Sequence, residues 1–497
     1  MLRLIPVLFF LALSAHAADS IQIQLTREPS TLDPMQVNDV YGFGVISNVV
    51  EGLLRIDGRG KLENGLAASY KLGNKNLRYE FVIRDTAKWS DGVPVSADDF
   101  VFGLRQALSA KVAARDADLL FAIKGAKDYF AGKSESLGVF RKGKNLVIDL
   151  DHPDSAFLQV LSMPLAAPVR KDIWEKNKGV WNFSDPVTGR YRITSYKLDR
   201  KIELEPNPFN NSPGQLPITY KVVAEEATAL NLFETGNLDI ISSIPKTEIK
   251  RLREKNLIQS SPGAATYFLT FDITQTPFRD LNWRKAFAAA IDRKSLAAVM
   301  GDTFTPTSSY IPLAIDGYKF FGNTDFMAAL NKVKQSGVKP AVKILFGSSA
   351  NGNLVMQKLQ ADFSKNLGLK VSLEPMEWKA FLGRLAANST QVFLMGLTAP
   401  YNDPMSHLKR FKSDEADNHS HYQNPAYDEL VQKIVETPVG TARTKLIQKA
   451  HELIVAKDAV VVPLLEAQQI FGVGPSIAGF MVNPFTVIQL DRLRKTK

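Results

Sequence analysis

The stretch from Leu77 to Leu108 constrains the fold most, because strand, turn and helix signals follow one another within it. Apolar and charged residues alternate at its beginning, and this period of two predicts a strand with one buried face. The segment Trp89–Gly92 ends in Asp-Gly, which favours a tight turn. Ser96 followed by Asp99 predicts a helix N-cap, and apolar residues then recur at helical spacing. The stretch predicts a packed piece of a mixed α/β domain, and no residue in it indicates catalysis.

The N-terminal residues 1–17 have the pattern of a secretory signal peptide. A single cation precedes an apolar run from Leu4 to Leu13, and small residues up to Ala17 fit a cleavage site. The chain has no cysteine, so no cleavage-site thiol is available for a lipid. No later apolar run reaches the roughly 18 residues that a membrane-spanning helix needs. These features predict a soluble periplasmic protein that has no membrane anchor and is not a lipoprotein.

The length and composition predict a globular protein with several lobes. The chain of 497 residues is longer than the roughly 250 to 300 residues at which a single core stops growing. It contains no internal repeat, low-complexity tract or flexible linker, which favours lobes joined by crossings of the chain. The 61 Lys and Arg exceed the 51 Asp and Glu. Since these charges are interspersed, we interpret the excess as solvated surface and predict no nucleic-acid partner.

Further segments give clear signals for helices and strands. Strands are predicted at 21–25 and 145–150, a hairpin pair is predicted at 188–193 and 202–208, and helical spacing is predicted from Val45 to Val50. Three further signals follow one another. Apolar residues alternate at 342–346, they then lie on one helix face formed by Val355, Leu359, Phe363 and Leu367, and they alternate again at 369–373. This last order predicts a βαβ unit with parallel strands.

Several of these segments resemble one known family. The motifs are Arg84-Asp85, Lys88-Trp89-Ser90-Asp91-Gly92, Val95-Ser96-Ala97-Asp98-Asp99-Phe100, Leu32-Asp33-Pro34, Glu51-Gly52-Leu53-Leu54, Trp283-Arg284-Lys285-Ala286-Phe287 and Asn424-Pro425-Ala426-Tyr427-Asp428. They are similar to those of the bacterial extracellular solute-binding proteins of family 5, the oligopeptide-binding group. The resemblance covers nearly all of the chain after the signal peptide.

The resemblance implies a periplasmic binding protein of the type II-like α/β fold, with two lobes joined by crossing strands and an extra inserted lobe. Lobe I is expected at 18–50, 176–269 and 468–497, the inserted lobe II at 51–175 and lobe III at 270–467. A peptide or peptide-like solute is expected between lobes I and III. The closed, monomeric protein is expected to deliver it to inner-membrane permease subunits of an ABC importer.

Motifs for catalysis and for metals are weak in this sequence. It has no G-x-S-x-G, no H-E-x-x-H and no P-loop, so we predict a protein that is not an enzyme and needs no cofactor. His419 and His421 lie near Asp414, Glu415 and Asp417, a set that can bind a divalent cation. We interpret this segment as a solvated polar loop and predict no metal site.

The resemblance also implies a set of ligand-binding residues. Its members are Val40, Tyr267, Trp378, Leu397, Ala399, Tyr401 and Asp403. Trp378 is expected to line a side-chain pocket, and Val40 to offer backbone groups to an extended ligand. Binding sites commonly combine such aromatic walls with a few oriented polar groups.

The sequence departs from the family at the position that binds the peptide ammonium. Peptide-binding members have Asp in the motif Ala-Asp-Tyr, whereas this chain has Pro400 there. Proline has neither a charge nor an N–H group, and a buried ammonium without a counter-charge costs several kcal/mol. An Arg that several members carry six residues earlier is Leu394 here. Asp403 or Asp39 can replace the lost carboxylate, or the solute is a non-peptide or N-blocked compound.

Overall fold

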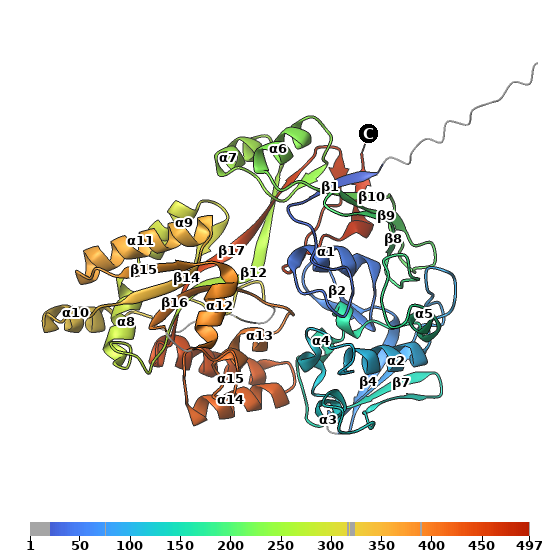
Figure 1. Ribbon diagram of the computed structural model, residues 1–497, viewed down its shortest axis with the longest axis horizontal. Helices are drawn as coiled ribbons and strands as arrows, with labels where there is room; N and C mark the ends of the chain where they lie inside the picture. Colours follow the sequence, from blue (N-terminus) through green and yellow to red (C-terminus); the bar gives the residue numbers. More distant parts are fainter. Residues whose placement is uncertain (1–19, 75, 316–317, 319–323, 388–389, 497) are drawn as a thin grey trace, which may run out of the picture.

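The computed structural model describes residues 20–74, 76–315, 318, 324–387 and 390–496 (Figure 1). The predicted signal peptide, residues 1–17, lies outside the described residues. Among the described residues, no helix is both long and apolar enough to cross a membrane.

One large mixed sheet runs through the molecule. Its strands are β1 (Ile21–Leu25), β8 (Tyr191–Lys197), β9 (Lys201–Pro206), β10 (Ile218–Val222), β11 (Ile240–Ile241), β12 (Ile258–Phe271), β13 (Phe304–Pro306), β14 (Lys343–Gly347), β15 (Ser372–Met376), β16 (Val392–Thr398) and β17 (Val461–Val473). Their order is β15-β14-β16-β12-β17-β11-β1-β10-β9-β8, and β13 pairs with β17. Since β12 and β17 are long, they cross from one side of the molecule to the other (Figure 1).

We use the name lobe I for the side of this sheet around β1 and β8 to β11. Its core includes Ile21, Ile23, Val45, Tyr191 and Ile240, all of them buried. Helices α1 (Val40–Val49), α6 (Glu226–Glu234) and α7 (Lys246–Glu254) belong to it, as does the C-terminal pair β18 (Ile477–Ala478) and β19 (Arg494–Lys495). The short helix η5 (Leu490–Arg492) lies between these two strands in the chain.

We use the name lobe II for the part that contains a separate four-stranded sheet of order β4-β5-β7-β6 and a two-stranded sheet of β2 and β3. The strands of lobe II are β2 (Leu54–Ile56), β3 (Leu62–Asn64), β4 (Ala67–Gly73), β5 (Arg78–Ile83), β6 (Val139–Lys142) and β7 (Asn145–Asp149). Its helices are α2 (Ala97–Ala107), η1 (Ala117–Leu120), α3 (Ala126–Phe130), α4 (Phe157–Val160), η2 (Pro164–Ala166) and α5 (Lys171–Lys176). Phe81, Phe100 and Leu146 are fully buried between sheet and helix.

Lobe III is the other side of the large sheet, around β12 to β17. Its helices are α8 (Leu281–Ala290), α9 (Arg293–Met300), α10 (Met327–Ser336), α11 (Ala350–Leu367), α12 (Trp378–Ala386), α13 (Met405–Leu408), η3 (Lys409–Phe411), α14 (Pro425–Glu436), α15 (Thr441–Glu452) and η4 (Leu453–Lys457). Fully buried apolar side chains from α8 and α11 pack on the sheet, among them Phe287 and Phe363. Because each lobe has its own core, each lobe can move as a unit. The lobe boundaries predicted from the sequence stay predictions.

The sequence signals for elements are largely confirmed. The strand, turn and helix of the opening stretch are β5, a turn with Gly92 at φ 87°, and α2. Ser96 and Asp99 form a capping box, in which Asp99 accepts from the Ser96 N–H at 2.8 Å. The pairing of β14 with β15 is parallel, as the βαβ pattern predicts.

Several predicted boundaries are wrong. Strand β8 begins at Tyr191 rather than Thr188, because the Gly189 N–H bonds the Val49 carbonyl of α1, and β9 ends at Pro206 rather than Pro208. Helix α1 begins at Val40 rather than Val45, because the Asp39 carboxylate caps the N–H groups of Tyr41 and Gly42. Strand β15 begins at Ser372 and not at Leu369. The Leu369 N–H instead bonds the carbonyl of Phe363, so this residue still belongs to the cap of α11.

Candidate interlobe cleft

An open cleft of about 780 Å³ lies beside the crossing strands. Lobe I lines it with the end of β1, the start of α1 and part of the C-terminal segment, and lobe III adds Asn351. Strands β1 and β10 are parallel, as are β14, β15 and β16. Thr26 and Arg27 directly follow β1, and Asn351 follows β14. The cleft therefore lies at carboxyl ends of parallel strands, where open α/β sheets bind ligands.

The crossing strands are irregular beside the cleft. Pro262 of β12 pairs with Gln468 of β17, and the next pair is Thr266 with Glu466. The extra residues of β12 form a β-bulge, which bends and twists a strand locally. Burial raises the pKa of Glu466, whose Oε1 accepts from Thr307 Oγ1 at 2.9 Å. The lobes are thus joined at a bend that contains a buried carboxyl group.

Val40 lies in the cleft as the first residue of α1, with 45% of its surface exposed. The Asp39 carboxylate caps the next two N–H groups, and also accepts from the Ser30 N–H at 3.1 Å. No described residue accepts a hydrogen bond from the Val40 N–H. This donor is therefore open to a ligand, whereas Asp39 is engaged in holding the helix start.

Trp378 and Tyr267 lie on lobe III. Trp378 is the first residue of α12, is 54% exposed, and stacks on Phe381 with ring centroids 5.3 Å apart. Its ring lies over Gly347, where a Cβ would come within 2.9 Å of it. Tyr267 is half-buried, packs edge-on against Phe304, and has its pKa raised by burial. Trp378 thus presents ring surface at the carboxyl end of β14.

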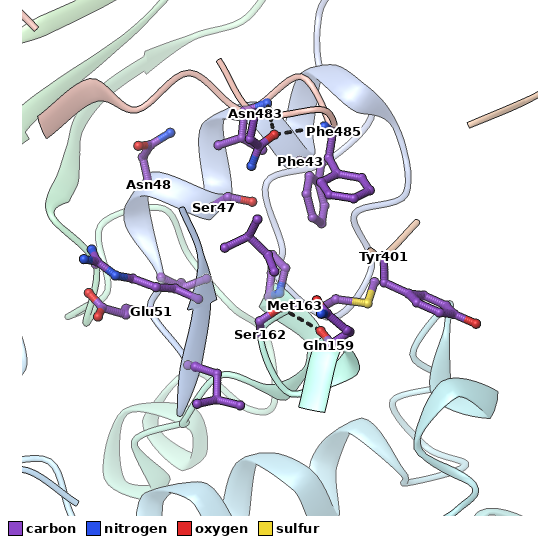
Figure 2. Close-up of a pocket in the computed structure, with 18 of the residues that line it drawn as sticks. Phe43, Ser47, Asn48, Glu51, Gln159, Ser162, Met163, Tyr401, Asn483 and Phe485 are labelled. Atoms are coloured by element: carbon purple, nitrogen blue, oxygen red, sulfur yellow. Dashed lines mark hydrogen bonds between the residues drawn. The ribbon is translucent and has the colours of Figure 1, made fainter. Parts of the chain in front are cut away.

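The remaining predicted residues lie elsewhere. Leu397 and Ala399 are buried in a core of lobe III. Pro400 and Tyr401 line a second, much smaller cavity of about 70 Å³ where the three lobes meet (Figure 2). Tyr401 also packs against Ala156 and Met163 of lobe II. The structure therefore does not bring all predicted residues into one cavity.

The second cavity has a polar lining. Burial raises the pKa of Glu51, and Glu51 Oε2 accepts from Asn210 Nδ2 at 2.9 Å. Ser47 Oγ is buried and has no partner among the described residues. Phe43 and Ser47 of α1 face this cavity (Figure 2), whereas Val40 and Gly44 line the cleft. Helix α1 therefore separates the two spaces.

Asp403 forms a buried ion pair. Its Oδ1 lies 2.8 Å from Arg443 Nη2, and the two side chains are only 5% and 4% exposed. The same oxygen accepts from the Met405 N–H at 2.9 Å, at the start of α13. In this structure, Asp403 neutralises Arg443 and organises a turn.

The described residues contain no cluster of three or more His, Asp or Glu placed to hold a metal ion. Asp414 is paired with Lys412 and Asp417 with Arg410. His421 Nδ1 lies 3.0 Å from Asp272 Oδ1 instead of facing the other acids. The prediction that this loop binds no metal stays a prediction.

Sequence reasoning missed several residues of the cleft. Arg27, Tyr41, Asn351, Gln468 and Thr486 line it and come from five separate segments. One signal was available, because Arg27 opens the turn-rich loop that follows the first predicted strand. The other residues are brought together only by the crossing strands and the C-terminal segment.

Two α/β lobes joined by long strands across an open cleft, with a third lobe added, form the type II-like fold of periplasmic binding proteins. Residues 61–419 match the family model described as "Bacterial extracellular solute-binding proteins, family 5 Middle". The chain belongs to this family.

Relatives resemble the chain over nearly its whole length. The oligopeptide-binding protein OppA of Bacillus subtilis is 28% identical over 467 residues, which cover 88% of this chain and 85% of OppA. The probable deoxycholate-binding periplasmic protein YgiS of Escherichia coli is 26% identical over 481 residues, which cover 92% and 89%.

Solved structures share the fold. The unliganded open form of the murein tripeptide-binding protein MppA has a TM-score of 0.84 at 24% identity, over 97% of this chain and 98% of MppA. The complex of Haemophilus influenzae OppA with RPPGFSPFR has a TM-score of 0.78 at 25% identity, over 97% and 99%.

Proposed function

We propose that this protein binds peptides or peptide-like solutes in the periplasm and delivers them to the inner-membrane permease of an ABC importer. The observation that carries the proposal is the open cleft beside β12 and β17, the two strands that join lobes I and III. The peptide-binding proteins among the relatives support the class of solute. We further propose that residues 1–17 direct export and that the mature protein is a monomer without enzymatic activity.

Binding is expected to shift the protein from an open to a closed state. A solute that touches Val40 on lobe I and Trp378 on lobe III gains both sets of contacts only after closure. A ligand shifts such an equilibrium by its difference in affinity for the two states. The bulge in β12 places the bend beside the cleft, so the lobes can rotate while each core stays intact.

The test is the mass spectrum of solute released from protein purified from the periplasm, followed by binding of the identified solute. The proposal expects short peptides or modified peptides, and a smaller radius of gyration in X-ray scattering when they are added back. Release of a compound without peptide bonds, together with no thermal shift from peptide libraries, would contradict it.

A second candidate is a non-peptide solute bound in the same cleft. Pro400 removes the family's ammonium-binding carboxylate, and Asp403 is paired with Arg443. The similar protein YgiS is a probable deoxycholate-binding protein, which supports a solute without peptide bonds. The released solute distinguishes the two candidates.

A further inference from the structure

The geometry points to Arg27 as the residue that binds a carboxylate of the solute, and to a solute that is an anion without a free ammonium group. This inference rests on the proposed function and deepens it by naming the solute's charge and a specificity residue on lobe I. We base the inference on which charged side chains of the cleft already form hydrogen bonds or ion pairs within the protein.

Arg27 lies where a ligand is expected and is itself unengaged. It follows the carboxyl end of β1, is exposed, and lines the cleft. Its guanidinium has no hydrogen bond or ion pair with any residue that the structure describes. The neighbouring acid, Glu28, points away, since it accepts from the Tyr196 hydroxyl and from the Asp199 N–H. A guanidinium binds a carboxylate through two parallel hydrogen bonds, which makes Arg27 suited to an anionic group.

Other cations near the cleft are less suited to this role. Lys246 Nζ is 3.4 Å from Asn351 Oδ1, a contact from α7 to α11. Arg253 forms an ion pair with Asp302 at 2.5 Å. The position of the family's additional Arg is Leu394, which is buried in the core of lobe III. Among the described residues that line the cleft, Arg27 is therefore the cation that is free to bind a carboxylate of the solute.

The acidic side chains near the cleft are less available to an ammonium group than Arg27 is to a carboxylate. Glu226 lines the cleft, but its Oε1 accepts from Ser243 Oγ at 3.0 Å. Asp39 caps α1, and Asp403 neutralises Arg443. Pro400 cannot provide a charge. Each of these carboxylates already accepts a hydrogen bond from its own lobe, so an ammonium would share an engaged carboxylate, whereas a carboxylate would meet an unengaged guanidinium.

The inference is tested with three libraries of the same tripeptides. One has a free amine and a free carboxylate, one is N-acetylated with a free carboxylate, and one is N-acetylated and C-amidated. Isothermal titration of the full mature protein is expected to rank the acetylated acids first. Amidation should weaken binding about tenfold or more, the range of a lost charged hydrogen bond. Arg27→Gln should weaken the acetylated acids by the same factor and abolish the effect of amidation.

Three variants make the result specific. Arg27→Lys should retain part of the preference for acids, because charge remains while the paired geometry is lost. Lys246→Gln removes a cation at the cleft edge and should leave the preference unchanged. Glu226→Gln tests whether Arg27 serves that acid instead of the solute. If Glu226→Gln and Arg27→Gln shift all three libraries alike, the inference is overturned.

The inference can fail separately from the proposed function. If free-amine peptides bind most tightly and Arg27→Gln does not alter the ranking, peptide binding stands and the inference is wrong. If no library binds, the peptide proposal fails. In that case the inference is tested by the charge of the solute that is released from the purified protein. An anion that the Arg27→Gln variant no longer retains supports the inference, and any other result overturns it.

Discussion

Replacing Asp403 by asparagine should destabilise lobe III without changing the solute preference. The carboxylate lies 2.8 Å from Arg443 Nη2, and at an effective dielectric constant of 20 this attraction is about 6 kcal/mol. Desolvation of the two buried groups offsets part of it. Asparagine keeps an oxygen that can accept from the Met405 N–H and from Arg443 Nη2, but it removes the negative charge that neutralises the buried guanidinium. Breaking such a pair costs about 3–5 kcal/mol.

The assay is thermal and urea unfolding of Asp403→Asn, of Arg443→Met and of the double variant. The double variant should recover most of the loss, because it leaves no unpaired buried charge. The exposed pair of Glu429 and Lys433 provides the control, and Glu429→Gln should cause no measurable loss. If Asp403→Asn instead keeps full stability and loses affinity only for free-amine peptides, then Asp403 binds the ammonium and our reasoning is refuted.

Further predictions concern the cleft, the core and the opening stretch. Trp378→Ala should weaken solute binding by about 1 kcal/mol and reduce the tryptophan fluorescence change on titration, since this ring is exposed at the cleft side of lobe III. Burial lowers the pKa of His407 and of His451 to about 3, so both are neutral in the folded protein. The unfolded chain takes up these protons near pH 6.5. Their contribution to stability is therefore full above pH 6.5 and falls by about 1.4 kcal/mol per pH unit and histidine toward pH 3, as urea unfolding should show. A pH slope unchanged in a His407→Gln variant would contradict this. Ser96→Ala should cost about 1 kcal/mol through loss of the cap on α2, measured by thermal unfolding.

The sequence predicts elements well where local chemistry decides them. Strand β5 and helix α2 follow from alternation, a turn and a cap that lie next to one another in the chain. The early start of α1 was missed because Gly42 and Gly44 interrupt the apolar spacing there. The cap by Asp39 sets that boundary, and apolar periodicity carries no information about it.

The candidate site was harder to predict, because its walls depend on contacts between distant segments. Val40 and Thr486 meet in the cleft only through the packing of α1 against the C-terminal segment. Tyr401 follows a strand of lobe III, yet its side chain packs against Met163 of lobe II. A local motif match cannot distinguish the cleft from the second cavity, since both share α1 as a wall.

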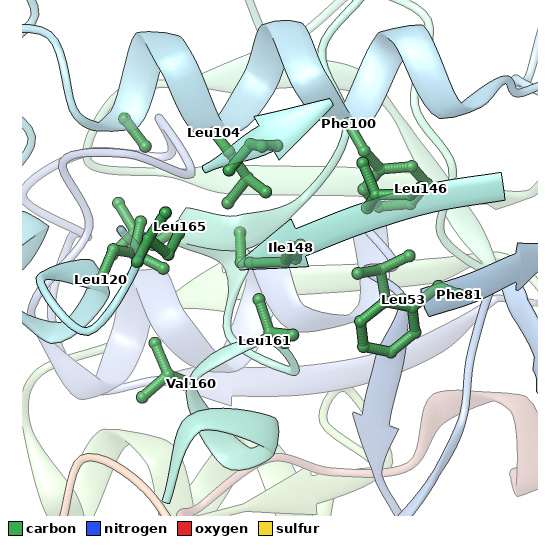
Figure 3. Packing of buried hydrophobic residues seen from close by; sticks show 14 of the residues in the cluster. Leu53, Phe81, Phe100, Leu104, Leu120, Leu146, Ile148, Val160, Leu161 and Leu165 are labelled. Carbon is green, nitrogen blue, oxygen red and sulfur yellow. The ribbon is translucent and has the colours of Figure 1, made fainter. Parts of the chain in front are cut away.

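The opening stretch and the cleft show how family identity and specificity are separated in this protein. Phe81 and Phe100 are buried with Leu146 in the core of lobe II (Figure 3), and none of the three lines the cleft. Substitutions there change packing and cost stability, so that stretch retains the family motif. Arg27 is exposed, so replacing it leaves every core intact. The charge of the solute can therefore change through residues such as Arg27 and Pro400 while the fold stays the same.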